Sequence, residues 1–109
     1  MRTFVGAAAV LTALSLPAQA GTATGKVAAL QVDGSHVIVS VAGPVASRAT
    51  CNVGNGFAAD AGSALGQAVN QTATAVQGTE FKVTVVGSGS CTVTPGFEDV
   101  VSLGVTTNR

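Results

Sequence analysis

The sequence contains no tryptophan and no tyrosine, and only 4% of its 109 residues are Phe, Trp or Tyr. Charged residues make up 9% of the chain, with five Lys and Arg against five Asp and Glu. This balance excludes a nucleic-acid-binding protein that works through a basic surface, because such proteins attract phosphates with an excess of Lys and Arg. Hydrophobic residues still make up 47% of the chain, which excludes an intrinsically disordered protein.

Side chains suited to catalysis are also scarce. His36 is the single histidine, and one histidine cannot by itself form a closed zinc site or a catalytic triad. Asp33, Glu98 and Asp99 are expected near strand ends, where we predict that they are solvated. Paired carboxylates need a shielded cleft, and so short a chain without Trp or Tyr has little material for one. We therefore predict a non-enzymatic protein with no cofactor and no metal site.

The first twenty residues have the pattern of a secretory signal peptide. Arg2 is followed by an uncharged apolar run from Phe4 to Leu16, and Ala18-Gln19-Ala20 supplies the small residues that a signal peptidase requires. The apolar run is too short to cross a bilayer comfortably. We expect cleavage after Ala20 and a single small domain of residues 21–109, periplasmic or secreted by a bacterium and not inserted in the membrane. The alternative is an uncleaved membrane anchor.

Cys51 and Cys91 are the only cysteines. Export would carry them into an oxidising compartment, and a domain this small gains stability from a covalent crosslink. We therefore predict one intramolecular disulfide between them. The alternative, a catalytic or metal-binding thiol, needs a nearby His or acid, and the spacing offers none.

The distribution of β-branched residues predicts short strands. Residues 26–42 resemble a hairpin that turns at Asp33-Gly34, since Asp-Gly is a strong hairpin signal. Further strands are predicted over 80–86, 91–94 and 100–106, and an irregular loop over 45–57. The side chains expected to face inward are Val37, Val39 and Val41 in the hairpin, Phe81, Val83 and Val85 in the next strand, and Val101, Leu103 and Val105 in the last.

One helix is predicted, from Asp60 as the N-cap to Gln77, with Gly78 as the stop. The apolar spacing would bury Ala61, Ala64, Leu65, Ala68, Val69, Thr72, Ala75 and Val76. The element order is then β-β-α-β-β-β, a mainly β fold with one helix. One helix cannot cover five strands, so we expect a small curled sheet or a barrel similar to the oligosaccharide-binding (OB) type.

The predicted helix is unusual because no charged residue occurs from Ala61 to Thr79. Its outer face presents neutral polar side chains, among them Gln67, Asn70, Gln71 and Thr74. Such side chains cost less to desolvate than charges, which suits a contact surface. We therefore expect this face to pack against a second copy or another protein. The alternative is a chain of low charge throughout.

Three segments resemble a family of small bacterial exported proteins similar to the B subunit of subtilase cytotoxin. They are Gly25-Lys26-Val27 leading to Asp33-Gly34, Cys51 before the helix, and FKVTVVGSGSC from Phe81 to Cys91. The resemblance spans about residues 25–107 and implies an OB-type barrel, one disulfide and homo-pentamers. In the toxin, pentamers bind glycans on host cells. The resemblance assigns no glycan-binding residue to this chain, because aromatic faces commonly contact sugars and the chain has neither Trp nor Tyr.

These observations together predict an exported, non-enzymatic binding or assembly module that acts as a homo-oligomer or binds a glycan or protein ligand, without nucleic acid. One alternative is a monomeric periplasmic inhibitor or accessory protein. A second is a small hydrolase, which would require His36 or the acids to converge.

Overall fold

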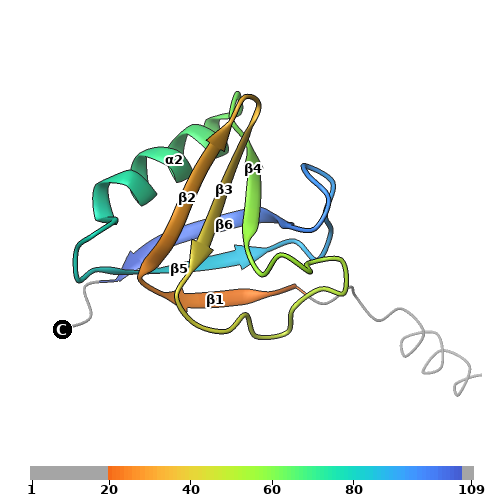
Figure 1. Cartoon of the computed structure of the whole chain (residues 1–109), viewed down its shortest axis with the longest axis horizontal. Helices are drawn as coiled ribbons and strands as arrows, with labels where there is room; N and C mark the ends of the chain where they lie inside the picture. The colour runs from red at the N-terminus through yellow and green to blue at the C-terminus, as the bar shows by residue number, and fades with distance from the viewer. Residues whose placement is uncertain (1–19, 107–109) are drawn as a thin grey trace, which may run out of the picture.

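The computed structural model describes residues 20–106 (Figure 1). The predicted signal peptide lies outside the described residues except for Ala20. The elements in chain order are β1 (Thr22–Gly25), β2 (Val27–Asp33), β3 (His36–Val41), β4 (Phe57–Asp60), α2 (Ala64–Val76), β5 (Lys82–Gly87) and β6 (Glu98–Thr106).

The six strands form one curled sheet in the order β1-β5-β6-β4-β3-β2. Neighbouring strands are antiparallel, except that β4 runs parallel to β6. In Figure 1, β1 and β5 run across the molecule with β6, while β2, β3 and β4 cross them steeply. The two edge strands, β1 and β2, follow each other directly in the chain. The predicted mainly β fold with one helix and a curled sheet is therefore confirmed as a half-barrel.

Helix α2 packs against the sheet through four inward residues: Gly66, Val69, Ala73 and Val76. The helix contacts strands β2, β3, β4 and β6. The core also contains the predicted inward residues of β3 and β5, since Val39, Val83 and Val85 are 0% exposed. No helix within residues 20–106 has the length and hydrophobicity of a membrane-spanning segment.

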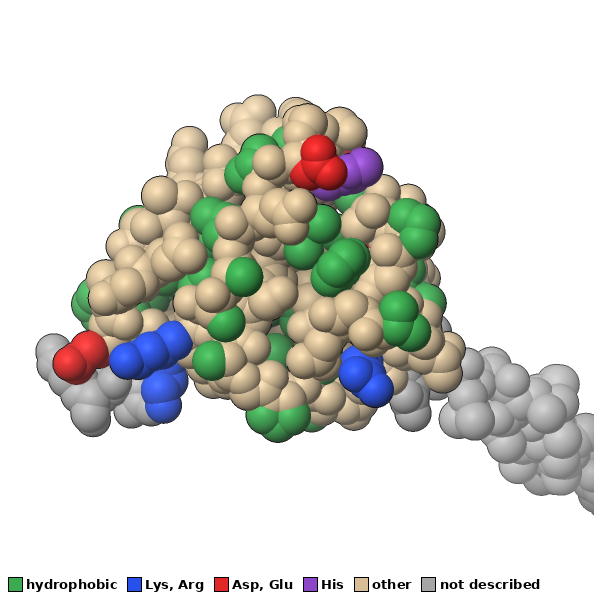
Figure 2. Space-filling view, viewed as in Figure 1, with side chains coloured by type: hydrophobic (Ala, Val, Ile, Leu, Met, Phe, Trp, Pro, Cys, Tyr) green, Lys and Arg blue, Asp and Glu red, His purple; other side chains and the backbone are tan. Residues whose placement is uncertain are grey.

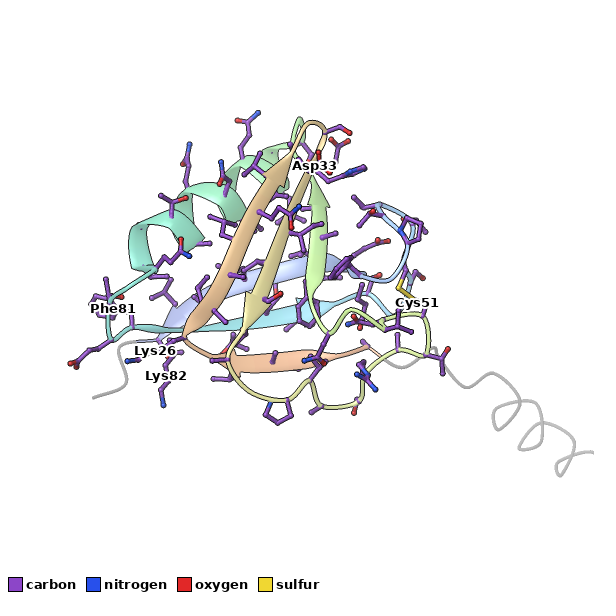
Figure 3. All side chains as sticks on the ribbon, in the orientation of Figure 1. Lys26, Asp33, Cys51, Phe81 and Lys82 are labelled. Carbon is purple, nitrogen blue, oxygen red and sulfur yellow. A yellow bond between two sulfur atoms is a disulfide. The ribbon has the colours of Figure 1, made fainter. Side chains whose placement is uncertain are left out.

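Two sequence signals are confirmed in detail. The β2–β3 hairpin turns at Gly34, whose φ of 58° lies in the left-handed region that favours glycine. Cys51 and Cys91 form the predicted disulfide, with their Cα atoms 6.1 Å apart. The crosslink joins the loop before β4 to the loop after β5, and Figure 3 shows Cys51 at the end of the molecule away from Lys26 and Lys82.

The strand predictions were wrong at three places. Strands β1 and β4 were not expected; β4 was missed because its Phe57, Ala58 and Ala59 are all buried and so do not alternate. Conversely, residues 91–94 are not a strand. The Asp99 carboxylate accepts hydrogen bonds from the backbone N–H groups of Thr92 and Val93, which removes both donors from any β-ladder.

The start of the helix was also predicted wrongly. Asp60 ends β4, and the N-cap is Ser63, whose hydroxyl accepts a hydrogen bond from the backbone N–H of Gly66 at 2.9 Å. A Cβ at Gly66 would collide with the backbone of Asp60, so glycine permits the close approach of the first helical turn to the end of β4. The buried stripe of the helix consists of Gly66, Val69, Ala73 and Val76, so Ala64, Leu65, Ala68 and Ala75 are exposed rather than buried.

The inward faces of two strands differ from the prediction. Phe81 precedes β5 and is 42% exposed. In β6, Val101 and Val105 are 54% and 43% exposed, whereas Val100 is buried. The register between β5 and β6 shifts between Val86 and Gly87, and this bulge turns Val100 inward in place of Val101. Beyond the bulge, Leu103 lies opposite Val85 and packs against the core as predicted, whereas Val105 lies opposite Val83 and stays exposed.

Candidate functional site

The most constrained polar group of the described chain is the carboxylate of Glu98. This side chain is 0% exposed and begins β6, next to Phe57 of the parallel strand β4. Predicting it as a solvated acid was wrong. The sequence signal that could have identified Glu98 is its spacing from Val100. The two residues are two positions apart in the strand, so their side chains point to the same face, and Val100 is also buried.

Four hydrogen-bond donors surround this carboxylate. Its Oε2 accepts from the backbone N–H of Gly21 at 2.7 Å and of Gly89 at 2.9 Å. Its Oε1 accepts from Asn52 Nδ2 at 3.2 Å and, more weakly, from the backbone N–H of Ala49 at 3.5 Å. An ionised carboxylate only accepts hydrogen bonds, so a set made entirely of donors fits the charged form.

The donors come from three segments that are distant in sequence. Gly21 precedes β1, Ala49 and Asn52 belong to the loop between β3 and β4, and Gly89 follows β5. Asn52 is itself 1% exposed, and its Oδ1 accepts from the backbone N–H of Gly56 at 3.2 Å. Because the disulfide links two of the same segments, Glu98 and the crosslink fix this end of the molecule together.

Asp99 lies on the opposite face of the same strand, as the alternation predicts. Its Oδ2 accepts from the Thr92 hydroxyl at 2.6 Å, and its Oδ1 from the backbone N–H groups of Thr92 and Val93. Burial alone would raise the pKa of Asp99, but the hydrogen bonds from Thr92 and Val93 outweigh it, and the pKa is lowered from its usual value. This carboxylate therefore organises the loop that carries Cys91.

An open pocket of about 330 Å³ is lined by Ser35, His36, Asp60, Thr92 and Val93. Figure 2 shows the histidine next to an acidic side chain at the top of the molecule. Asp60 uses its Oδ1 to accept from the backbone N–H of Gly62 at 3.0 Å. His36 and Asp60 are register partners in strands β3 and β4, and among residues 20–106 no side-chain hydrogen bond joins the imidazole of His36 to Ser35 or Asp60. Asp33 ends β2 at the hairpin and is exposed (Figure 3). No group of three or more His, Cys, Asp and Glu in the described part of the chain is placed to hold a metal ion.

The predicted interface residues lie on the outer side of α2. Gln67, Gln71 and Thr74 are exposed, while Asn70 is half-buried and its Oδ1 accepts from the Thr74 hydroxyl at 3.5 Å. The exposed Ala64, Leu65, Ala68 and Ala75 extend this surface, so the outer face of α2 combines small apolar and neutral polar groups.

Strand β2 lies beside this face and is an edge of the sheet. From Ala28 to Asp33 its residues are exposed, apart from the half-buried Leu30. An edge strand leaves one row of backbone N–H and C=O groups without a strand partner. We call β2 together with the exposed residues of α2 the neutral surface. Figure 2 views the molecule from the side of β2, and the charged side chains visible in that view lie near the outline of the molecule.

Comparisons of the chain with protein-family models, with curated proteins and with solved structures found no match.

Proposed function

We propose that the protein is an exported, non-enzymatic binding module that assembles with copies of itself through the neutral surface. The observation that carries this proposal is the exposed edge strand β2, which is uncharged from Val27 to Val32 and lies beside the uncharged helix α2. Natural edge strands are commonly protected from pairing by charges, prolines or a covering segment. None of the residues from Val27 to Val32 is charged or proline.

The charges at the two ends of β2 favour a second copy as the partner. Lys26 precedes the strand, and Asp33 ends it; both are exposed. Antiparallel pairing of two β2 strands brings the Lys26 end of one copy next to the Asp33 end of the other, at both ends of the contact. Opposite charges at the rim steer association and fix its orientation, while the uncharged centre is inexpensive to desolvate.

The pocket at His36 supports binding rather than nucleophilic catalysis. A serine or histidine mechanism needs a nucleophile hydrogen-bonded to a base that is itself oriented by a third group. Ser35 and His36 are consecutive residues, and the Asp60 carboxylate is engaged by Gly62. The groups that line this pocket are suited to contacting the hydroxyl or amide groups of a ligand.

The surface is tested by adding charge to β2. In the double variant Ala29→Lys, Gln31→Lys, both changes fall on exposed residues, and like charges would face each other across the paired strands. We expect size-exclusion chromatography with light scattering to give the mass of a single chain. Gln67→Glu with Thr74→Glu on α2 tests the adjoining face in the same way.

The matched control is Thr50→Lys with Val53→Lys, which adds the same charge at exposed positions away from β2 and α2. It should keep the mass of the unmodified protein. If the β2 variant and the control have the same mass as the unmodified protein, the neutral surface is not the interface. A single-chain mass for the unmodified protein would instead support the monomeric accessory alternative.

A further inference from the structure

The predicted cleavage site lies where the chain passes from the surface into the protein. Ala20 is exposed, and Gly21 is buried. The backbone nitrogen of Gly21 donates to Glu98 Oε2 at 2.7 Å, which is the shortest of the four contacts to this carboxylate. The nitrogen that a signal peptidase would release is therefore the one that already touches the buried acid.

We infer that removal of the signal peptide completes the fold by creating a buried ion pair between the new α-ammonium group of Gly21 and the carboxylate of Glu98. In this hydrolysis, water breaks the Ala20–Gly21 peptide bond. Ala20 leaves with a carboxylate, and the Gly21 nitrogen becomes an amine that is protonated to an ammonium. An amide donor to Glu98 is thus replaced by a cationic donor at the same position.

The surroundings of Glu98 explain why this charge matters. The four groups that donate to Glu98 in the uncleaved chain are neutral: three backbone N–H groups and one side-chain amide. A buried carboxylate surrounded only by neutral donors remains uncompensated in charge, which is costly in a protein interior. An ammonium group at the same position adds a direct Coulomb attraction to the carboxylate, which a neutral N–H group lacks.

The identity of residue 21 fits the same interpretation. A Cβ at Gly21 would lie 2.7 Å from Glu98 Oε1 and 2.8 Å from Val45 Cγ1. Both distances are shorter than a van der Waals contact, so only glycine lets the backbone nitrogen approach the carboxylate. Gly21 also accepts a hydrogen bond through its carbonyl from the backbone N–H of Gly87 at 2.8 Å, which holds the nitrogen in place.

The test compares two oxidised chains that differ by one residue, one starting at Gly21 and the other at Ala20. In the longer chain the nitrogen of Gly21 is an amide, and the ammonium group is displaced to the exposed Ala20. We expect the folding equilibrium constant, from denaturant unfolding at neutral pH, to be about tenfold larger for the chain that starts at Gly21. The difference should disappear when both chains carry Glu98→Gln.

Equal stability of the two Glu98 chains would overturn the inference, as would N-terminal sequencing of the exported protein that finds a start other than Gly21. A measurement without any mutation covers the case in which Glu98→Gln does not fold. The buried amine of the Gly21 chain should react at least tenfold more slowly with an amine-specific reagent than the exposed amine of the Ala20 chain. Equal reaction rates would also contradict the ion pair.

Discussion

The backbone nitrogen of Gly21 and Oε2 of Glu98 lie 2.7 Å apart, although 77 positions of sequence separate the two residues. This contact fastens the segment before β1 to the beginning of β6. Gly89 donates to the same oxygen, and Asn52 to the other, so one buried carboxylate connects three loops that have little regular structure of their own. The order of this end of the molecule depends on an acid rather than on apolar packing alone.

Enlarging the glycine beside this acid should destabilise the protein. A Cβ at Gly87 would lie 2.5 Å from Glu98 Cδ, so Gly87→Ala should lower the free energy of unfolding by about 1–3 kcal/mol. Gly104 in β6 is the matched control, because a Cβ there would meet nothing within 4 Å. Gly104→Ala should be neutral or slightly stabilising. Urea unfolding measures both, and equal effects would contradict the close contact at Gly87.

Placing a second carboxylate next to Glu98 should lower the free energy of unfolding more than Gly87→Ala does. Asn52→Asp replaces the donating amide with an acceptor, so two buried carboxylates would face each other. We expect a loss of at least about 2 kcal/mol in the free energy of unfolding at neutral pH. The exposed Asn55→Asp makes the same chemical change next to Arg48, whose Nη1 lies 3.4 Å from Asn55 Oδ1, and should stay within about 0.5 kcal/mol. Similar losses in both variants would argue against the buried network.

Removing the disulfide should destabilise the protein by an amount set by the loop that it closes. Cys51 and Cys91 are 40 positions apart, for which the chain-entropy model gives about 4 kcal/mol. The variant Cys51→Ala, Cys91→Ala is compared with the oxidised protein in denaturant. A loss below about 1 kcal/mol would show that Glu98 and its hydrogen bonds hold these loops without the crosslink.

The Asp99 carboxylate predicts a pH dependence in acid. Its pKa in the folded protein is lowered from 3.8, so the folded state favours the ionised form more than the unfolded state does. The resulting stability is present above pH 3.8 and is lost as the pH falls through the lower pKa of the folded protein. Asp99→Asn should therefore reduce stability at neutral pH and show a smaller further loss in acid, as measured by denaturant unfolding at several pH values. An unchanged slope of stability against pH would contradict this assignment.

Local signals in the sequence were sufficient for much of the fold. The Asp33-Gly34 turn, the alternating valines of β3 and the pair of cysteines each depend on neighbouring residues or on a single possible pairing, and all three were predicted correctly. Strand β4 could not be predicted in this way. Phe57 and Ala59 belong to the hydrophobic core, and Ala58 between them is also 0% exposed, so β4 is buried on both faces and shows no alternation. Burial on both faces depends on tertiary packing, which the local sequence does not carry.

The role of Glu98 was missed for a related reason. An acid at a strand end is usually solvated, and only the folded arrangement brings Gly21, Asn52 and Gly89 around it. The lack of charge on α2 can be read directly from the sequence, and Gln67, Gln71 and Thr74 are exposed as predicted, but the buried stripe is narrower than predicted because Ala64, Leu65, Ala68 and Ala75 are also exposed. Strand β2, the other part of the neutral surface, was predicted as a strand. Its position at the edge of the sheet was not, because that position follows from the strand order.

The most direct test of self-association is sedimentation equilibrium of the oxidised chain of residues 21–109, over a hundredfold range of concentration. We expect a mass that approaches a whole-number multiple of the single-chain mass as the concentration rises. The mass of one chain at every concentration would contradict the assignment of β2 and α2 as a surface for a second copy.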